Sequence, residues 1–305
     1  MRRILSILDL SAEQFQRVID EAIDNEGRAI QRCLEGKNVG IWFDQPSTRT
    51  RTAFTLASSI LGASIVEYKR DEMQLTTGES LLDTAKVLAQ FLDILVIRGE
   101  SFSQLQTFCD AGIPLVINAL TDEEHPTQAL ADYMTLKRHF GRLEELRILF
   151  IGDGGNIATS LMLAGCRLCG AELHFITPRR YGFTPGIIGR AFELAKEYGA
   201  HLEYHHDPGK LPRNVDAVYT TRWRSLGKEK TDPDWRKDFE GFQINGELLA
   251  QVSGSNTVIL HDLPAERGAE IDAAILDSTY SLVLQQAGNK LATARSLLGS
   301  LVNHR

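Results

Sequence analysis

Short apolar runs alternate along the whole chain with stretches in which apolar residues recur at helical spacing. An unbroken apolar run predicts a strand buried on both faces, and the longer periodic stretches predict amphipathic helices. The expected strands are residues 39–43, 65–68, 93–98, 114–118, 147–151, 172–176, 217–220 and 257–261. The expected helices cover residues 11–32, 47–61, 79–92, 125–136, 157–169 and about 282–302.

This alternation predicts an α/β fold made of two doubly wound parallel-sheet domains, because a buried parallel sheet needs helices on both faces. A polar stretch at 137–141 separates two series of strands and helices. We therefore expect one domain at residues 1–140, completed by the C-terminal helix at about 282–305, and a second at 141–281. Ligands of such sheets gather at the carboxyl ends of the strands. The active site is expected in the cleft between the two domains.

Composition agrees with an ordinary globular protein. The chain has 305 residues, 43% of them hydrophobic and 24% charged, which is enough for two separate cores. No apolar run approaches the roughly 20 residues that span a bilayer, and the N-terminus carries no secretion signal, so we expect a cytoplasmic protein without membrane contact. The net charge of −7 argues against general nucleic-acid binding.

Two short motifs suggest metal or redox chemistry but lack the context for it. Cys166 and Cys169 form one CxxC pair inside an apolar helical pattern with no second pair, so packing is their expected role. His205-His206-Asp207 lies in an irregular region without partner ligands, where a solvated loop is the simpler interpretation. We expect no metal and no cofactor.

The densest polar cluster follows the first apolar strand. Ser47-Thr48-Arg49-Thr50-Arg51 comes directly after Pro46 and opens a helix, with Ser47 or Thr48 as the N-cap. A helix N-terminus presents backbone N–H groups and a positive dipole end, and two guanidiniums add bidentate donors. The cluster predicts a binding site for a phosphate or a carboxylate. The alternative is a solvated helix start whose arginines pair with surface acids.

Three further polar residues are expected at the same edge of the first sheet. Arg98 ends a predicted strand, and His125 and Gln128 lie at the start of the helix that follows another strand. An anion held by arginines, with a neutral donor and an amide beside it, suits transfer of an acyl-like group from a phosphate leaving group. No side chain stands out as a covalent nucleophile, so direct attack by the acceptor is the simplest route.

The second half contains a glycine-rich turn at Gly152-Asp153-Gly154-Gly155-Asn156. It resembles part of a dinucleotide-binding fingerprint, but the third glycine is missing and no acid follows the next strand. Arg179 and Arg180 would suit a 2′-phosphate. Nicotinamide binding therefore stays open as an alternative function of the second domain.

At these residues the sequence resembles the aspartate/ornithine carbamoyltransferase family, nearly from end to end. Residues 47–51 and 125–128 are similar to the two carbamoyl-phosphate motifs of that family. The resemblance implies transfer of the carbamoyl group from carbamoyl phosphate to the amine of an amino acid, with release of phosphate. It implies a cytoplasmic homotrimer in which a loop of the neighbouring subunit completes each site. Gln74 is similar to the glutamine that ornithine enzymes use in that loop.

The resemblance also assigns roles to single residues. It implies that the phosphate is bound by Ser47, Thr48, Arg49 and Thr50. The carbamoyl group would be held by Arg98, His125 and Gln128, and the catalytic residues would be Arg49, Arg98 and His125.

Acceptor recognition combines features of both branches of the family. Asn156 and the loop from Asp262 resemble the ornithine branch, although Asp262 replaces the cysteine of its His-Cys-Leu-Pro motif. Thr221-Arg222 resembles the pair with which aspartate enzymes bind a carboxylate. Lys290 stands where ornithine enzymes carry an arginine, and Thr55 where both branches usually carry glutamate. The expected acceptor-binding residues are Asn156, Thr221, Arg222, Arg224, Ser225, Asp262 and Leu263.

In physical terms, Arg222 with Arg224 would pair with an acceptor carboxylate, and Asp262 would hold or help deprotonate the attacking amine. Ornithine or a related diamino acid is the favoured acceptor. Aspartate carbamoyl transfer stays open, and so does a non-catalytic homologue that only binds a phosphate ligand. The intact set of Arg49, Arg98, His125 and Gln128 argues against the silent homologue.

Overall fold

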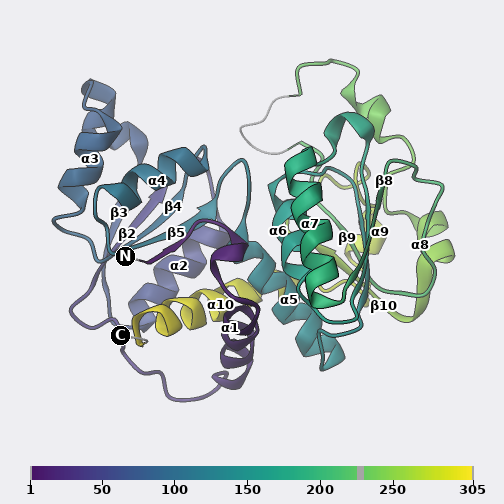
Figure 1. Ribbon diagram of the computed structural model, residues 1–305, viewed down its shortest axis with the longest axis horizontal. Coiled ribbons are helices and arrows are strands. Elements are labelled where there is room, and N and C mark those ends of the chain that lie inside the picture. Colours follow the sequence, from purple (N-terminus) through teal and green to yellow (C-terminus); the bar gives the residue numbers. More distant parts are fainter. Residues whose placement is uncertain (1, 225–229, 304–305) are drawn as a thin grey trace. The chain divides into compact units, whose positions relative to one another are not determined.

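The computed structural model describes residues 2–224 and 230–303 (Figure 1). The chain forms two compact units: unit 1 comprises Met1–Met134 and Gly288–Arg305, and unit 2 comprises Thr135–Ala287. Each unit contains one five-stranded parallel sheet flanked by helices, which confirms the predicted α/β fold. Across the described residues, none of the helices combines the length and the apolar character needed to cross a bilayer.

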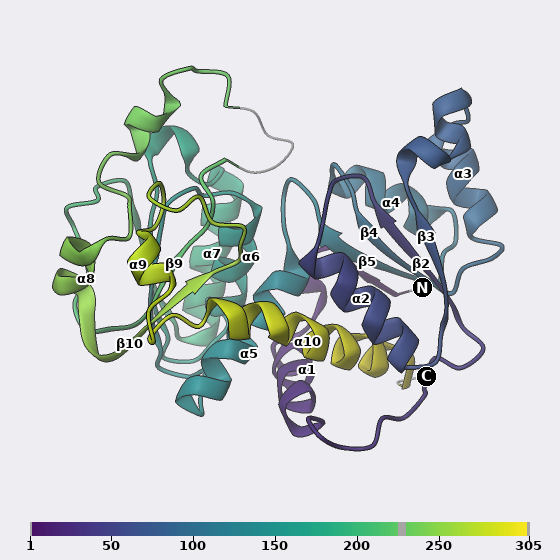
Figure 2. The same ribbon diagram turned by 180° about the vertical axis from the view of Figure 1, so that it is seen from behind.

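The sheet of unit 1 has the strand order β1-β5-β4-β2-β3, and every neighbouring pair is parallel. Its strands are β1 (Arg2–Ile4), β2 (Asn38–Phe43), β3 (Ser64–Tyr68), β4 (Ile94–Arg98) and β5 (Leu115–Leu120). Its helices are α1 (Ala12–Asp24), α2 (Arg49–Ile60), α3 (Leu81–Leu88) and α4 (Phe102–Asp110), together with parts of α5 (Pro126–Phe140) and α10 (Val283–Asn303). Within this unit, α10 lies beside α2 (Figure 2).

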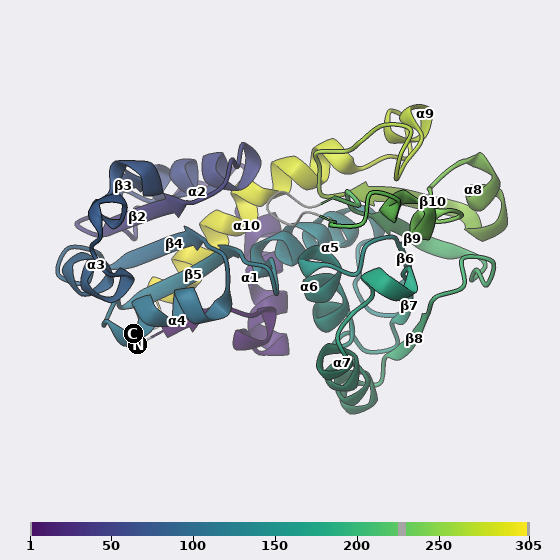
Figure 3. The ribbon, with the colours of Figure 1, turned by 90° about the horizontal axis from the view of Figure 1, so that it is seen from above.

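The sheet of unit 2 has the order β10-β9-β6-β7-β8 and is also fully parallel. Its strands are β6 (Arg147–Ile151), β7 (Glu172–Ile176), β8 (His201–His205), β9 (Val215–Thr220) and β10 (Ser253–His261). Its other helices are α6 (Asn156–Gly165), α7 (Pro185–Tyr198), α8 (Gly246–Val252) and α9 (Ala273–Leu276). Figure 3 shows α6 and α7 on one face of this sheet and α8 and α9 on the other.

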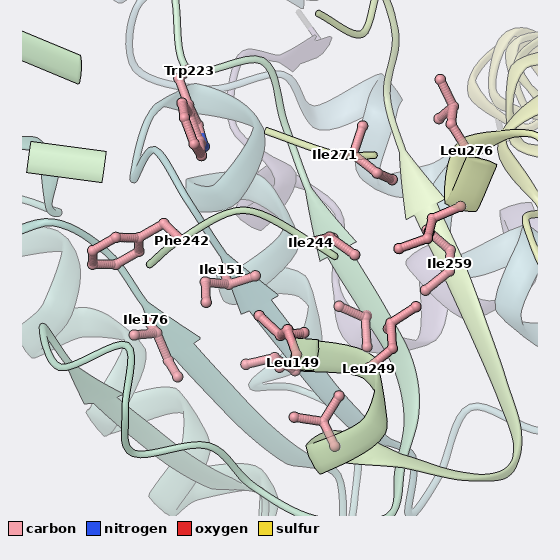
Figure 4. Close-up of a cluster of buried hydrophobic side chains, with 14 of the residues drawn as sticks. Leu149, Ile151, Ile176, Trp223, Phe242, Ile244, Leu249, Ile259, Ile271 and Leu276 are labelled. Atoms are coloured by element: carbon pink, nitrogen blue, oxygen red, sulfur yellow. The ribbon is translucent and has the colours of Figure 1, made fainter. Parts of the chain in front are cut away.

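The apolar runs build the two cores, as the pattern predicted. In β4, Leu95, Val96 and Ile97 are fully buried. In unit 2, Leu149 and Ile259 from two strands pack with α8 and α9 on one face of the sheet (Figure 4). Trp223, from the segment after β9, and Phe242, from the segment before α8, complete this cluster.

Several expected boundaries are wrong, and local chemistry explains why. The first helix ends at Asp24 rather than near residue 32, because Gly27 adopts a positive φ of 72° within a polar run. Helix α3 begins at Leu81 because the Ser80 side chain accepts the Asp83 N–H as an N-cap. Helix α6 ends at Gly165, before the CxxC pair, of which Cys166 is buried and Cys169 is exposed.

The pattern also missed β1, β8, α4, α7, α8 and α9. His205, expected in a loop, ends β8.

Candidate active site

The polar cluster of unit 1 surrounds the point where the sheet reverses its winding. From β2 the chain adds β3 on one side, whereas β4 and β5 lie on the other. Phe43 and Arg98, the last residues of β2 and β4, are register partners there, and α2 begins six residues later at Arg49. Crevices at such switch points are where open α/β sheets bind ligands.

The start of α2 differs from the expectation in one respect. Thr48 occupies the N-cap position but makes no capping hydrogen bond, because its backbone is already helical (φ −75°, ψ −55°) rather than extended. Arg98 Nη1 donates to the Pro46 carbonyl over 3.2 Å, which ties this strand end to the loop before α2. Ser47 and Arg49 are half-buried, and Thr50 is buried.

His125 lies buried at the centre of this cluster, just before α5. Its Nε2 is 3.5 Å from Thr50 Oγ1 and 3.5 Å from Lys290 Nζ, and its Nδ1 is 3.3 Å from Thr127 Oγ1. An ammonium only donates, so its position favours Nε2 as an acceptor and Nδ1 as the donor to Thr127. The structure thus brings together residues from α2, α5 and α10.

Burial and then the positive charges of Lys290, Arg98 and Arg49 hold the pKa of His125 well below its ordinary value. The ring is therefore neutral at physiological pH. A neutral imidazole does not add to the repulsion among the three cations, and their positive charge favours an anionic ligand beside it. This arrangement can bind a phosphate ester and stabilise negative charge that develops on an oxygen beside it.

Lys290 and Asp132 are functional candidates to which the sequence prediction gave no role. Lys290 Nζ donates to Gln128 Oε1, and Gln128 Nε2 donates to Asp132 Oδ1 over 2.7 Å. All three side chains are buried. The chain of contacts fixes both ends of the Gln128 amide and directs a third cation toward His125. The family pattern marked Lys290 as a departure, but only the fold brings residue 290 to residue 125.

Gln74 lies apart from these contacts. It is exposed at the start of a 3₁₀ turn (Gln74–Thr77), where Thr77 Oγ1 donates to its Oε1 over 2.7 Å. Thr48 is likewise exposed.

The polar residues of unit 2 also lie at a switch point, between β6 and β9. The glycine-rich turn 152–155 leaves β6 and leads into α6, whose first residue is the buried Asn156. The segment 221–224 leaves β9, and Thr220 Oγ1 donates to the Ile151 carbonyl over 2.6 Å, which joins the two strand ends. At the next strand, His261 is the register partner of Thr220. The three groups of expected acceptor residues therefore share one edge of the sheet.

Two of the acceptor candidates hydrogen-bond to each other, and a third lies near a carboxylate. Thr221 Oγ1 donates to Asp262 Oδ1 over 2.8 Å, and Arg222 Nη2 lies 3.9 Å from the Glu266 carboxylate. Arg224 is exposed. Ser225 lies outside the described residues. Glu266 is a carboxylate that the sequence prediction did not include.

The loop that carries Asp262 and Leu263 donates hydrogen bonds to a buried histidine–glutamate pair. His261 Nε2 is 3.0 Å from Glu270 Oε1, and both side chains are fully buried. The Leu263 N–H donates to His261 Nδ1 over 2.8 Å, and the Glu266 N–H donates to Glu270 Oε1 over 2.6 Å. Leu263 adopts a left-handed φ of 56°, a strained conformation for a branched side chain. Glu270, nine residues beyond His261, gave no signal in the sequence.

Among residues 2–224 and 230–303, His, Cys, Asp and Glu side chains form no group of three that could hold a metal ion.

Comparison with known proteins gives the same family over both units. Residues 2–138 match the family described as "Aspartate/ornithine carbamoyltransferase, carbamoyl-P binding domain". Residues 144–301 match "Aspartate/ornithine carbamoyltransferase, Asp/Orn binding domain".

Individual relatives agree over their full length. An ornithine carbamoyltransferase of Ignicoccus hospitalis is 38% identical over 308 residues, covering 99% of this chain and 98% of the relative. One from Thermosynechococcus vestitus is 40% identical over 305 residues, covering 99% and 96%. The solved ornithine carbamoyltransferase from Pyrococcus furiosus superposes with a TM-score of 0.92 at 34% identity, covering 100% of this chain and 98% of that one. With both units matched, the chain belongs to the aspartate/ornithine carbamoyltransferase family of enzymes.

Proposed function

We propose that the protein transfers the carbamoyl group of carbamoyl phosphate to the side-chain amine of ornithine and releases phosphate. The observation that carries this proposal is the cluster of Arg49, Arg98 and Lys290 around a neutral His125. Relatives that match nearly the whole chain are named ornithine carbamoyltransferases, which supports ornithine as the acceptor.

In this proposal unit 1 binds carbamoyl phosphate. The phosphate lies at the start of α2, against Ser47, Thr48, Arg49 and Thr50, where helix dipole and guanidinium both favour an anion. The carbamoyl oxygen faces Arg98 and His125, with Gln128 behind them. Gln74 reaches the phosphate of a neighbouring subunit, consistent with its exposed position.

Unit 2 binds the acceptor in this proposal, through Asn156, Thr221, Arg222, Arg224, Ser225, Asp262 and Leu263. Arg222 pairs with the carboxylate of the amino acid, exchanging its long contact to Glu266 for a closer one. Asp262, already a hydrogen-bond acceptor from Thr221, receives the ammonium group and helps it lose a proton. The amine of the acceptor bound by unit 2 then reacts with the carbamoyl phosphate bound by unit 1.

The chemical step needs no covalent enzyme intermediate. The lone pair of the free amine forms a C–N bond to the carbamoyl carbon, giving a tetrahedral intermediate whose oxygen carries negative charge. Arg98 and His125 bind that oxygen, and Arg49 with the α2 start stabilises the departing phosphate when the C–O bond breaks. The amine gives up one proton, which leaves with the phosphate or through Asp262.

We also propose a cytoplasmic homotrimer formed through unit 1. Its edge strand β3, the helices α2 and α3 and the segment after α3 expose large apolar side chains, which the neighbouring subunits would cover in this proposal. These are Leu56, Val66, Leu82, Val87 and Phe91, each 44–62% exposed. Light scattering should give three times the chain mass of 33.9 kDa. A monomer at micromolar concentration would rule the trimer out.

A panel of acceptors tests the proposed reaction. The purified protein is incubated with carbamoyl phosphate and one of ornithine, aspartate, lysine, putrescine, 2,3-diaminopropionate or an N-acylated ornithine, and each ureido product is measured by chromatography. Ornithine should give turnover well above every other acceptor. If aspartate were the best acceptor, the second candidate function, aspartate carbamoyl transfer, would be favoured. Thr221-Arg222 is the feature of the sequence that supports it. No product from any acceptor, with carbamoyl phosphate still bound in calorimetry, would indicate a binding-only homologue.

A further inference from the structure

Lys230 is nearly buried in unit 2 and has no part in the reaction proposed above. Its side chain is 8% exposed, and lysine is rarely buried to this extent without compensation. Its Nζ lies 2.6 Å from Asp153 Oδ2 and 3.5 Å from the centroid of the Tyr181 ring. The ring centroids of Phe239 and Trp235 are 4.7 Å and 5.4 Å away. We call Asp153, Tyr181, Trp235 and Phe239 the ammonium box.

The box has the chemistry of a cation site. Ammonium groups are attracted to aromatic faces within about 6 Å, and a desolvated ammonium also needs an anionic partner. The box supplies three rings and one carboxylate. Lys237 and Asp234, on the same segment, form a contrasting pair: they are 3.1 Å apart but 71% and 67% exposed, so water competes for both. Burial therefore distinguishes Lys230 from Lys237, whose side chain is exposed to water.

The box controls the turn that precedes Asn156. Asp153 sits inside that turn, between two glycines whose N–H groups donate to the carbonyls of Ile176 and Tyr181 over 3.0 Å and 2.8 Å. A Cβ atom on Gly154 would lie 2.9 Å from the Tyr181 carbonyl oxygen, so the turn packs directly on Tyr181. Tyr181 thus holds the backbone of the turn, while Lys230 holds its only charged side chain.

The box also supports the segment that carries Arg222. The Phe239 ring stacks on Trp223 with centroids 4.7 Å apart and planes 28° from parallel, and it stacks on Tyr181 at 5.2 Å. Trp223 Nε1 lies 3.2 Å from the position of a Cβ on Gly152, so the indole packs against the turn. Asn156 and Arg222, expected to bind the same ligand, are therefore held by one set of aromatic rings with Lys230 at its centre.

We propose that Lys230 is a positioning residue for the acceptor: its ammonium fills the box and fixes the turn before Asn156 relative to Trp223 and Arg222. The box is then an internal site for one primary ammonium. This inference rests on the proposed function of unit 2 in binding the amino-acid acceptor. Without the ammonium, the Asp153 carboxylate would lose the cation that lies 2.6 Å from it, and the turn would move to bring the carboxylate to water.

Steady-state kinetics on Lys230→Met and Lys237→Met test this role. The first removes the ammonium from the box while keeping an apolar chain of similar length, and the second removes the exposed ammonium nearby. We expect Lys230→Met to raise the KM for the acceptor about tenfold, because small misplacement of binding groups is costly, and to leave the KM for carbamoyl phosphate within about twofold. Lys237→Met should change neither. An unchanged acceptor KM in Lys230→Met, or equal changes in both KM values, would overturn the proposal.

Chemical rescue separates positioning from a general structural role. In Lys230→Ala the empty box should accept ethylammonium, which should lower the raised acceptor KM in a saturable way, whereas propanol of similar size should not. The product is separated from any carbamoylated ethylamine by chromatography. Absence of rescue together with loss of acceptor binding would mean that Lys230 serves only the fold. If Lys230→Ala does not fold, Asp153→Asn keeps the side-chain volume, removes the charge that Nζ contacts, and should give the same split between the two KM values.

A binding measurement keeps this inference separate from the proposed reaction. Trp223 and Trp235 lie in or against the box, so their fluorescence in Lys230→Ala should change saturably with ethylammonium and not with propanol. The wild-type protein, whose box is filled, should show no such change. If the fluorescence responds but no amino acid is carbamoylated, the box stands as a cation site and the proposed function fails. If turnover is normal but the fluorescence does not respond, the box proposal fails alone.

Discussion

Each unit contains a five-stranded parallel sheet, yet the two units organise their polar residues differently. In unit 1, three cations lie around one neutral histidine and lower its pKa. In unit 2, the polar residues contact one another in pairs: Thr221 donates a hydrogen bond to Asp262, and Arg222 with Glu266 and Lys230 with Asp153 are pairs of opposite charge.

The difference follows from what each unit is proposed to bind. A phosphate is multiply charged and brings no cation of its own, so preassembled positive charge binds it directly. An amino acid brings both charges, so its site needs one partner for each. Those partners would be costly to leave unpaired when the site is empty. The contacts of Asp262 with Thr221 and of Arg222 with Glu266 are therefore expected to exchange for contacts with the acceptor, whereas the Asp153–Lys230 pair and the unit 1 cluster should change little.

The largest effect is expected when unit 1 loses a cation that is proposed to bind the phosphate. Arg49→Ala removes the guanidinium at the start of α2, and we expect kcat/KM to fall by about 10²–10³-fold, the range seen when one oxyanion donor is lost. Arg28→Ala, on the exposed segment after α1, is the control and should behave like wild type. Wild-type kinetics in Arg49→Ala would remove this residue from the site and weaken the contrast between the units.

A second substitution asks whether charge or shape matters at Lys290. Lys290→Met removes a positive charge that, after burial, does most to lower the pKa of His125. That pKa should therefore rise toward the ordinary value of about 6.5. Loss of the cation should also lower kcat about a hundredfold. Lys290→Arg keeps the charge and should keep the pKa of His125 low. Histidine NMR titration measures the shift, and an unchanged pKa in Lys290→Met would contradict the electrostatic coupling.

The same contrast explains what the sequence could predict. The strands and the anion cluster are local: apolar runs mark the strands, and five consecutive residues place hydroxyls and arginines at one helix start. Arg98 and His125 could be assigned to the same edge of the sheet because the carboxyl ends of parallel strands meet there. Helix ends were missed by up to eight residues, because single glycine and serine positions decide them.

Contacts between distant residues could not be predicted. Lys290 reaches His125 across 165 positions of sequence, and Lys230 reaches Asp153 across 77. Nothing in the pattern near any of these residues indicates its partner. Glu270 was missed for a related reason, since a carboxylate is expected to be exposed unless a partner such as His261 is known.

A third prediction concerns the pairs of unit 2. Arg222→Ala should raise the KM for the acceptor about tenfold or more while leaving that for carbamoyl phosphate nearly unchanged, because only a group that binds the acceptor alone splits the two constants. Arg236→Ala is a matched control, because Arg236 lies 2.9 Å from the same Glu266 carboxylate but is 56% exposed. If Arg236→Ala gave the same split, the effect would come from Glu266 rather than from a contact between Arg222 and the acceptor.

The smallest effect compares one buried histidine from each unit. Burial lowers the pKa of both His125 and His174, but nearby cations lower the first further, whereas Glu203 partly opposes the second. The unfolded chain takes up a proton at each histidine near pH 6.5, before the folded chain does, so protonation below that pH favours unfolding. Each group can cost at most about 1.4 kcal/mol per pH unit below its unfolded pKa. The melting temperature should therefore fall between about pH 7.5 and about pH 5.5, which bracket that value. His125→Gln should reduce this pH-dependent decrease in melting temperature more than His174→Gln does. Equal falls in both variants would mean that the cations of unit 1 are screened by solvent, and that the two units differ less in charge than their contacts indicate.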